Sequence, residues 1–184
     1  MYNNNGNAGI KKVKSTPAVW AMRVLLALVF AACSMGTVMQ IYDSAPYGIF
    51  GMFSGGGLIA LCVIVGVLYT AVKYLLFTFL LRAGYNSYSR AMNYMGEGTI
   101  DHNYLYAAVT VSWICAGSLS AVLSVLSIFY TVQLMVIAEF LQLIFKLAAM
   151  AAALAILARK AGKENFSFLF NALAPLFAVG VLLL

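Results

Sequence analysis

Residues 133–150 read QLMVIAEFLQLIFKLAAM, a stretch of 18 residues with one acidic and one basic side chain. Its length and apolar character match the about 20 residues that a helix needs to cross the hydrocarbon core of a membrane. On a helix, Glu139, Gln142 and Lys146 share one face, because Gln142 and Lys146 lie three and seven positions after Glu139. A charged group at the centre of a bilayer costs at least about 2.5–3.5 kcal/mol, so we expect this face to turn toward other helices or toward water.

The apolar character of this stretch extends over the whole chain. Of its 184 residues, 64% are hydrophobic and 9% are charged, whereas a soluble domain carries about 25% charged residues. The composition therefore predicts an integral membrane protein without room for a separate soluble domain. The net charge of +6 is interpreted as a feature of membrane topology and of contact with anionic lipid, and not of nucleic-acid binding.

The apolar runs predict an all-α fold, an integral membrane bundle of about five transmembrane helices with one short interfacial amphipathic helix. We expect a disordered basic cytoplasmic tail over 1–17 and one transmembrane domain over 18–184, with spans at about 18–41, 58–81, 105–129, 133–158 and 166–184. Residues 48–56, GIFGMFSGG, are expected to form an interfacial or partly re-entrant lead-in, and a tight hairpin is expected near 130–132. The first run is also compatible with a signal peptide, but its length favours a retained helix.

The interfacial helix is expected in the longest polar connection, 82–104. Tyr85, Tyr88, Met92 and Met95 recur there at intervals of three and four residues. This spacing is typical of a short amphipathic helix that lies on the membrane surface, where it could recognise anionic lipid.

The distribution of Lys and Arg predicts the threading of the chain. The tail and the connections 82–104 and 159–165 hold eight of these residues, whereas the connections 42–56 and 130–132 hold none. Cytoplasmic loops carry an excess of Lys and Arg. We therefore expect a multi-pass protein of the cell membrane, with a cytoplasmic amino terminus and the carboxyl terminus outside.

One further charge, Lys73, lies inside the second span. Its long side chain could reach the inner headgroups, or it could join Glu139, Gln142 and Lys146 in what we call the polar stripe. Two interpretations of this stripe remain open. It could be a clasp that locks helices together, within one chain or between chains, or it could line a path for an ion, a proton or a solute.

Small residues recur every four positions along the third span and form what we call the small-residue ridge: Ala108, Ser112, Ala116, Ser120 and Ser124. Such a ridge lets another helix backbone approach closely. The fourth span is rich in Ala between 148 and 155, so we expect the third and fourth spans to pack together. Self-association through the same ridge is the alternative.

Residues that could carry chemistry are few. Glu139 is the only carboxylate within a predicted span, and the motifs of known hydrolases, nucleotide-binding proteins and metalloproteases are absent from the sequence. The only histidine, His102, lies near Glu97 and Asp101 in a connection that we interpret as a solvated loop and not as a metal site. The three cysteines are interpreted as small buried hydrophobic residues. We expect neither a cofactor nor a metal, and no enzymatic activity.

The sequence thus favours an accessory or scaffold subunit that acts by helix–helix association in the lipid bilayer. Its partners would be other membrane-protein helices or further copies of the chain. The alternative is a transporter or channel subunit with a polar path along the fourth helix.

Overall fold

The computed structural model describes residues 16–44, 56–127 and 132–183. These ranges contain five helices and no strand, namely α1 (Pro17–Ser44), α2 (Gly56–Met95), α3 (His102–Ser127), α4 (Val132–Ala161) and α5 (Lys163–Leu183). The predicted all-α class is confirmed. The expected disorder of the tail up to residue 15, the lead-in over 48–55 and the hairpin at 130 and 131 lie outside the described residues.

Four of the described helices are long and apolar enough to cross a membrane, and they are α1, α2, α3 and α4. This agrees with the membrane protein that the composition predicts. The described apolar part of α5, Asn165–Val179, is shorter. A fifth crossing by α5 stays a prediction.

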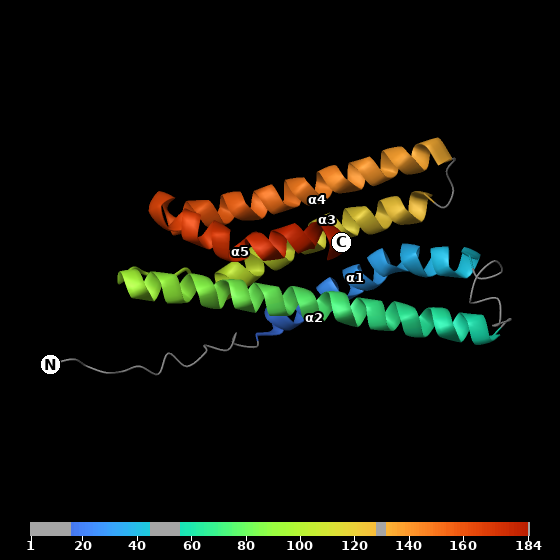
Figure 1. The fold of residues 1–184 in the computed structure, drawn as a ribbon, viewed down its shortest axis with the longest axis horizontal. Coiled ribbons are helices and arrows are strands. Elements are labelled where there is room, and N and C mark those ends of the chain that lie inside the picture. The colour runs from blue at the N-terminus through green and yellow to red at the C-terminus, as the bar shows by residue number, and fades with distance from the viewer. Residues whose placement is uncertain (1–15, 45–55, 128–131, 184) are drawn as a thin grey trace.

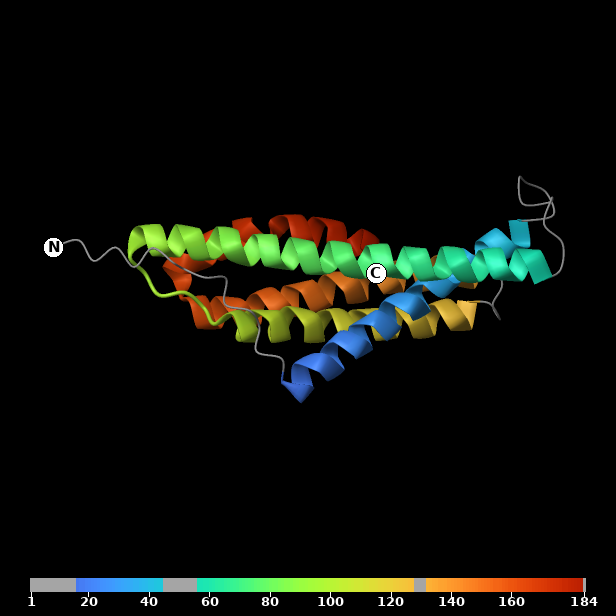
Figure 2. The ribbon, with the colours of Figure 1, turned by 90° about the horizontal axis from the view of Figure 1, so that it is seen from below.

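The helices form an elongated bundle (Figures 1 and 2). α3 packs against both α1 and α4, α2 packs against α1 and α5, and α4 also packs against α5. Figure 1 shows α4 on one side of the bundle and α1 and α2 on the other. The bundle therefore has two opposite lateral faces that belong to different helices.

Aromatic rings from four helices meet in the core. The ring centroid of Phe77 in α2 lies 6.0 Å from that of Phe30 in α1 and 5.5 Å from that of Trp113 in α3. Trp113 lies in turn 5.6 Å from Phe177 in α5. Phe30, Phe77 and Trp113 are almost completely buried. We call these four rings the aromatic cluster, and it joins α1, α2, α3 and α5.

The structure differs from the sequence-based expectation after residue 81. The predicted separate surface helix is instead the last part of α2, which runs without a break for 40 residues. Tyr88 and Met92 are buried in the bundle, Tyr85 is half-buried, and only Met95 is exposed. The apolar face of this segment therefore packs on protein and is not free to lie on a membrane surface.

α2 ends at Met95, immediately before a glycine. Gly96 has a φ of 74°, a left-handed conformation that glycine adopts without strain. Its N–H donates to the Asn93 carbonyl, and the Glu97 N–H donates to the Met92 carbonyl at 3.0 Å. These two bonds form a Schellman motif, which satisfies the last carbonyl groups of the helix.

A glycine explains how α5 comes so close to α2. A Cβ placed on Gly84 would lie 2.7 Å from the backbone oxygen of Ala172 in α5, so only glycine fits at this contact. In the antiparallel register that this contact sets, Leu183 is about level with Lys73. α2 therefore continues for about 25 Å beyond α5, at a rise of 1.5 Å per residue.

Replacement of Gly84 by Val tests this contact. We expect the substitution to lower the melting temperature of the purified protein in detergent, because overpacking against a backbone atom costs about 1–3 kcal/mol. Gly56→Val is the matched control, since a Cβ at Gly56 in the same helix meets nothing within 4 Å. Equal melting temperatures for the two variants would contradict the close approach of α5.

Candidate functional site

The polar stripe is only partly described by the structure. Glu139 belongs to α4, but the position of its side chain lies outside the described residues. Gln142 and Lys146 are half-buried on the same helix. The predicted clasp through Glu139 therefore stays a prediction.

Lys73 lies inside the bundle and does not extend to its surface. The residue is 5% exposed, and its Nζ lies 4.5 Å from the ring centroid of Tyr69, one helical turn earlier in α2. An ammonium group over an aromatic face is stabilised by the ring quadrupole, and more strongly where water is absent. Of the two alternatives for Lys73, the structure supports membership of a buried polar group over contact with headgroups.

Three helices bring their polar side chains together around Lys73. Lys73 in α2 and Lys146 in α4 lie within electrostatic range of each other, and both lie within range of Cys33 in α1. We call Lys73 and Lys146 the lysine pair. Across 16–44, 56–127 and 132–183, no carboxylate with a described side chain forms an ion pair with either lysine. The described side chains therefore supply no counter-charge to the lysine pair, and the side chain of Glu139 lies outside them.

The hydroxyl groups near the pair are already used within their own helices. Ser34 Oγ donates to the Phe30 carbonyl at 2.6 Å, and Thr70 Oγ1 donates to the Gly66 carbonyl at 2.8 Å. Such bonds to the preceding turn are a usual way for Ser and Thr to satisfy their hydroxyl groups. Each hydroxyl thereby uses its one hydrogen within its own helix, and its oxygen keeps lone pairs that can still accept a hydrogen bond.

The small-residue ridge of α3 lies inside the bundle. Ser112, Ala116 and Ser120 are buried and Ala108 is half-buried, whereas the side chain of Ser124 lies outside the described residues. Ser112 Oγ donates to the Ala108 carbonyl at 3.0 Å. The part of the ridge from 108 to 120 therefore belongs to the interior of one chain, and self-association through it stays a prediction.

Several buried polar groups of α3 have no hydrogen-bond partner among the described residues. They are His102 Nδ1, Thr110 Oγ1, Trp113 Nε1 and Ser120 Oγ. Buried polar atoms are almost always hydrogen-bonded, and a water molecule is the usual partner where protein supplies none. Thr110 could not be recognised as a polar site from the sequence, because a threonine within an apolar run carries no signal of its environment. The polar path along the fourth helix stays a prediction.

The residues of the predicted surface helix instead hold the connection between α2 and α3. The Tyr85 hydroxyl donates to the Ile100 carbonyl at 3.3 Å, and its ring lies 4.3 Å from that of His102. Among the described residues no group of three His, Cys, Asp or Glu side chains could hold a metal ion. These contacts give Tyr85 and His102 a structural role at the junction between α2 and α3.

The cysteines correct one further expectation. Cys62 is buried and Cys33 is half-buried, but Cys115 is exposed on α3. In a membrane protein an exposed apolar side chain can face lipid, so the interpretation as a buried residue is wrong for Cys115.

Comparison with known proteins does not assign the chain to a family. Neither a protein-family model, nor a curated protein, nor a solved structure matches this chain.

Replacement of Lys73 by Met tests whether the buried ammonium has a counter-charge. We expect the melting temperature in detergent to rise or stay unchanged, because a buried charge without a partner costs several kcal/mol of desolvation and a Met of similar shape does not. Lys160→Met is the matched control, since Lys160 is exposed and its Nζ lies 5.9 Å from the Tyr104 ring. A clear fall in the melting temperature of Lys73→Met alone would contradict this expectation, because it would show that contacts of the ammonium in the bundle, such as the one with Tyr69, outweigh its desolvation.

Proposed function

We propose that the chain is a multi-pass membrane protein that acts as an accessory or scaffold subunit, through association of its helices with other helices in the bilayer. The outer face of α4 is the surface on which a partner helix docks. The partner is a membrane protein or a second copy of the chain.

The observation that carries this proposal is a row of exposed alanines on α4. Ala148, Ala151, Ala152 and Ala155 are exposed, whereas Ala153 of the same helix is buried against the bundle. We call the four exposed residues the alanine face. Lipid is as apolar as the helices themselves, so helices associate in a membrane through close packing, which small residues on a surface allow.

Lys146 does not belong to the alanine face. It is half-buried on α4 and lies about half a turn before Ala148, so its side chain leaves the helix on the opposite side, on the face of the buried Ala153. The alanine face therefore consists of small apolar side chains, and a partner helix that docks on it packs against these and not against the charge of Lys146.

Substitution of Ala152 by Phe tests the alanine face. We expect the variant to lose co-purification of partner helices from native membranes, and to lose any dimer seen for the wild type by cross-linking in the membrane, because a large ring keeps two backbones apart. Ala60→Phe is the matched control, since Ala60 is also exposed but lies on α2.

A result in which wild type, Ala152→Phe and Ala60→Phe recover the same partners would contradict docking at the alanine face. A wild-type protein that is monomeric and recovers no partner would contradict the scaffold function itself.

The orientation that we propose follows from the cations at one end of the bundle. Arg82 and Arg90 lie toward the end of α2, and Arg159 and Lys160 lie at the end of α4, which runs in the same direction (Figure 1). Because cytoplasmic segments are enriched in Lys and Arg, we place this end in the cytoplasm, together with the amino terminus. The predicted outside position of the carboxyl end requires α5 to cross the bilayer, and its register against α2 gives no support for that.

Cysteine labelling tests this orientation in a variant whose three native cysteines are replaced by Ala. Ser87→Cys and Gly56→Cys each place one thiol at an exposed position, at opposite ends of the bundle. We expect a membrane-impermeant maleimide to label intact cells only for Gly56→Cys, and both variants after permeabilisation. The reverse pattern in intact cells would overturn the orientation.

A further inference from the structure

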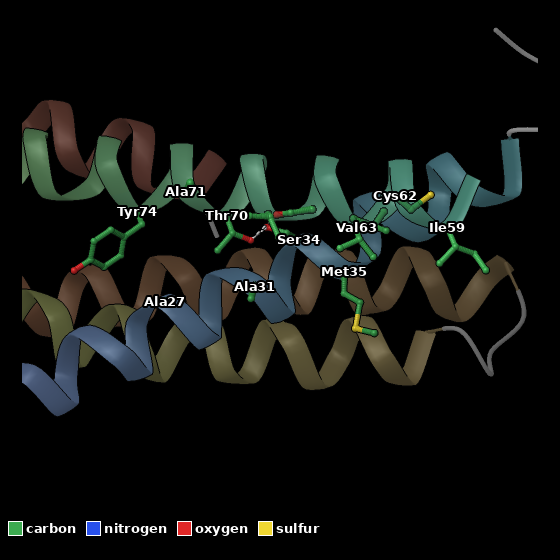
Figure 3. A pocket seen from close by; sticks show the side chains of 13 residues that line it. Ala27, Ala31, Ser34, Met35, Ile59, Cys62, Val63, Thr70, Ala71 and Tyr74 are labelled. Atoms are coloured by element: carbon green, nitrogen blue, oxygen red, sulfur yellow. Dashed lines mark hydrogen bonds between the residues drawn. The ribbon is translucent and has the colours of Figure 1, made fainter. Parts of the chain in front are cut away.

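A groove runs between α1 and α2 on the outer surface of the bundle. It has a volume of about 670 Å³, and its walls come from positions 27 to 38 of α1 and 59 to 74 of α2 (Figure 3). Ile59, Val63 and Val67, which line it, are each more than half exposed. The groove therefore opens toward the outside of the bundle, on the side where α1 and α2 are exposed.

The lining of the groove is suited to hydrocarbon. Most of its residues are Ala, Val, Ile, Met or Gly. Two of its polar groups, the Ser34 and Thr70 hydroxyls, already donate to backbone carbonyls of their own helices. A ligand in the groove thus meets few groups that need a hydrogen bond, and an unfilled groove would forfeit dispersion contacts.

One end of the groove carries a positive charge. Arg23 lies one turn before Ala27 on the same face of α1, and it lies within electrostatic range of Tyr74, which lines the same end of the groove in α2. Its guanidinium lies 5.9 Å from the ring centroid of Tyr106 in α3. Figure 3 shows Ala27 and Tyr74 at this end, and Ile59 at the other.

The groove is longer than the hydrocarbon of one leaflet, so it is long enough for an acyl chain. From Ile59 to Tyr74 the α2 wall is about 22 Å long at a rise of 1.5 Å per residue, and one leaflet contributes about 15 Å of hydrocarbon. A cation at one end of an apolar groove of this length is complementary to a lipid with a negative headgroup and a long acyl chain.

We propose that the groove between α1 and α2 is a binding site for one anionic phospholipid, with an acyl chain between Ala31 and Ala71 and the phosphate beside Arg23. The lipid comes from the surrounding bilayer. The site lies on the opposite side of the bundle from the alanine face and does not depend on the proposed scaffold function.

Native mass spectrometry of the full chain in mild detergent tests the site. The protein is titrated with phosphatidylglycerol and with phosphatidylcholine that carry the same palmitoyl and oleoyl chains, and the affinity for the first bound lipid is measured. Arg23→Gln removes the charge, with Arg90→Gln as its control, because Arg90 is exposed near the end of α2. Ala31→Phe fills the groove, with Ala60→Phe as its control, because both alanines are exposed but only Ala31 lines the groove.

The wild type is expected to bind phosphatidylglycerol about fivefold more tightly than phosphatidylcholine, and Arg23→Gln to abolish this preference. Ala31→Phe is expected to weaken the first binding of both lipids by about tenfold. Ala71→Phe, on the other wall, is expected to give the same loss, which keeps the test valid if Ala31→Phe fails to fold.

Three results would overturn the proposal. The first is equal affinity of the wild type for the two lipids, and the second is a preference for phosphatidylglycerol that survives in Arg23→Gln or is lost in Arg90→Gln. The third is lipid binding by both groove-filling variants that equals that of Ala60→Phe. A loss of dimers in those spectra with unchanged lipid binding would assign the groove to a second copy of the chain.

Discussion

The contact of aromatic rings across four helices is the interaction on which the arrangement of the bundle depends. Between helices in a membrane there is little hydrophobic driving force, so the helices must be held by shape and by close packing. Phe77 provides such packing at the middle of the aromatic cluster, with Phe30 on one side and Trp113 on the other. Lys73 lies one turn from Phe77 on α2, so the position of this cluster also fixes the level at which the buried ammonium lies within the bundle.

The length of α2 places a constraint on how the bundle meets a membrane. Its 40 residues correspond to about 60 Å, twice the about 30 Å of a hydrocarbon core. Tilt can absorb only part of this excess, so one end of α2 must project beyond the hydrocarbon. The last part of α2, with exposed Arg82 and Arg90, has the composition of the projecting end. α5 packs along this end of α2 at Gly84. Contacts with α5 therefore cover a segment that projects beyond the lipid.

The sequence was sufficient for the helical class and for where the five long helices begin, because apolar runs of membrane length have few other solutions. It was insufficient for the segment after residue 81, where a change from apolar to polar composition was interpreted as a change of helix. The backbone continued because a single Gly84 does not end a helix, whereas Gly96 in a left-handed conformation does. The environment of Lys73 could not be predicted either, since burial depends on which helices pack around it. The spacing of Tyr69 and Lys73 by one turn was the signal that could have indicated their contact.

The lysine pair lies between the two lateral faces of the bundle. α1 and α2 form the groove, while α4 carries the alanine face and packs on α3 and α5. Lys73 and Lys146 belong to helices on these opposite sides, yet they lie within electrostatic range, and each raises the energy of the other in a medium that screens charge poorly. Lys146 shares its face of α4 with the buried Ala153, about half a turn from the alanine face, so its charge turns into the bundle. The cost of the two ammonium groups therefore falls on the packing of α2 and α4 inside the bundle, and a helix that docks on the alanine face does not reach them.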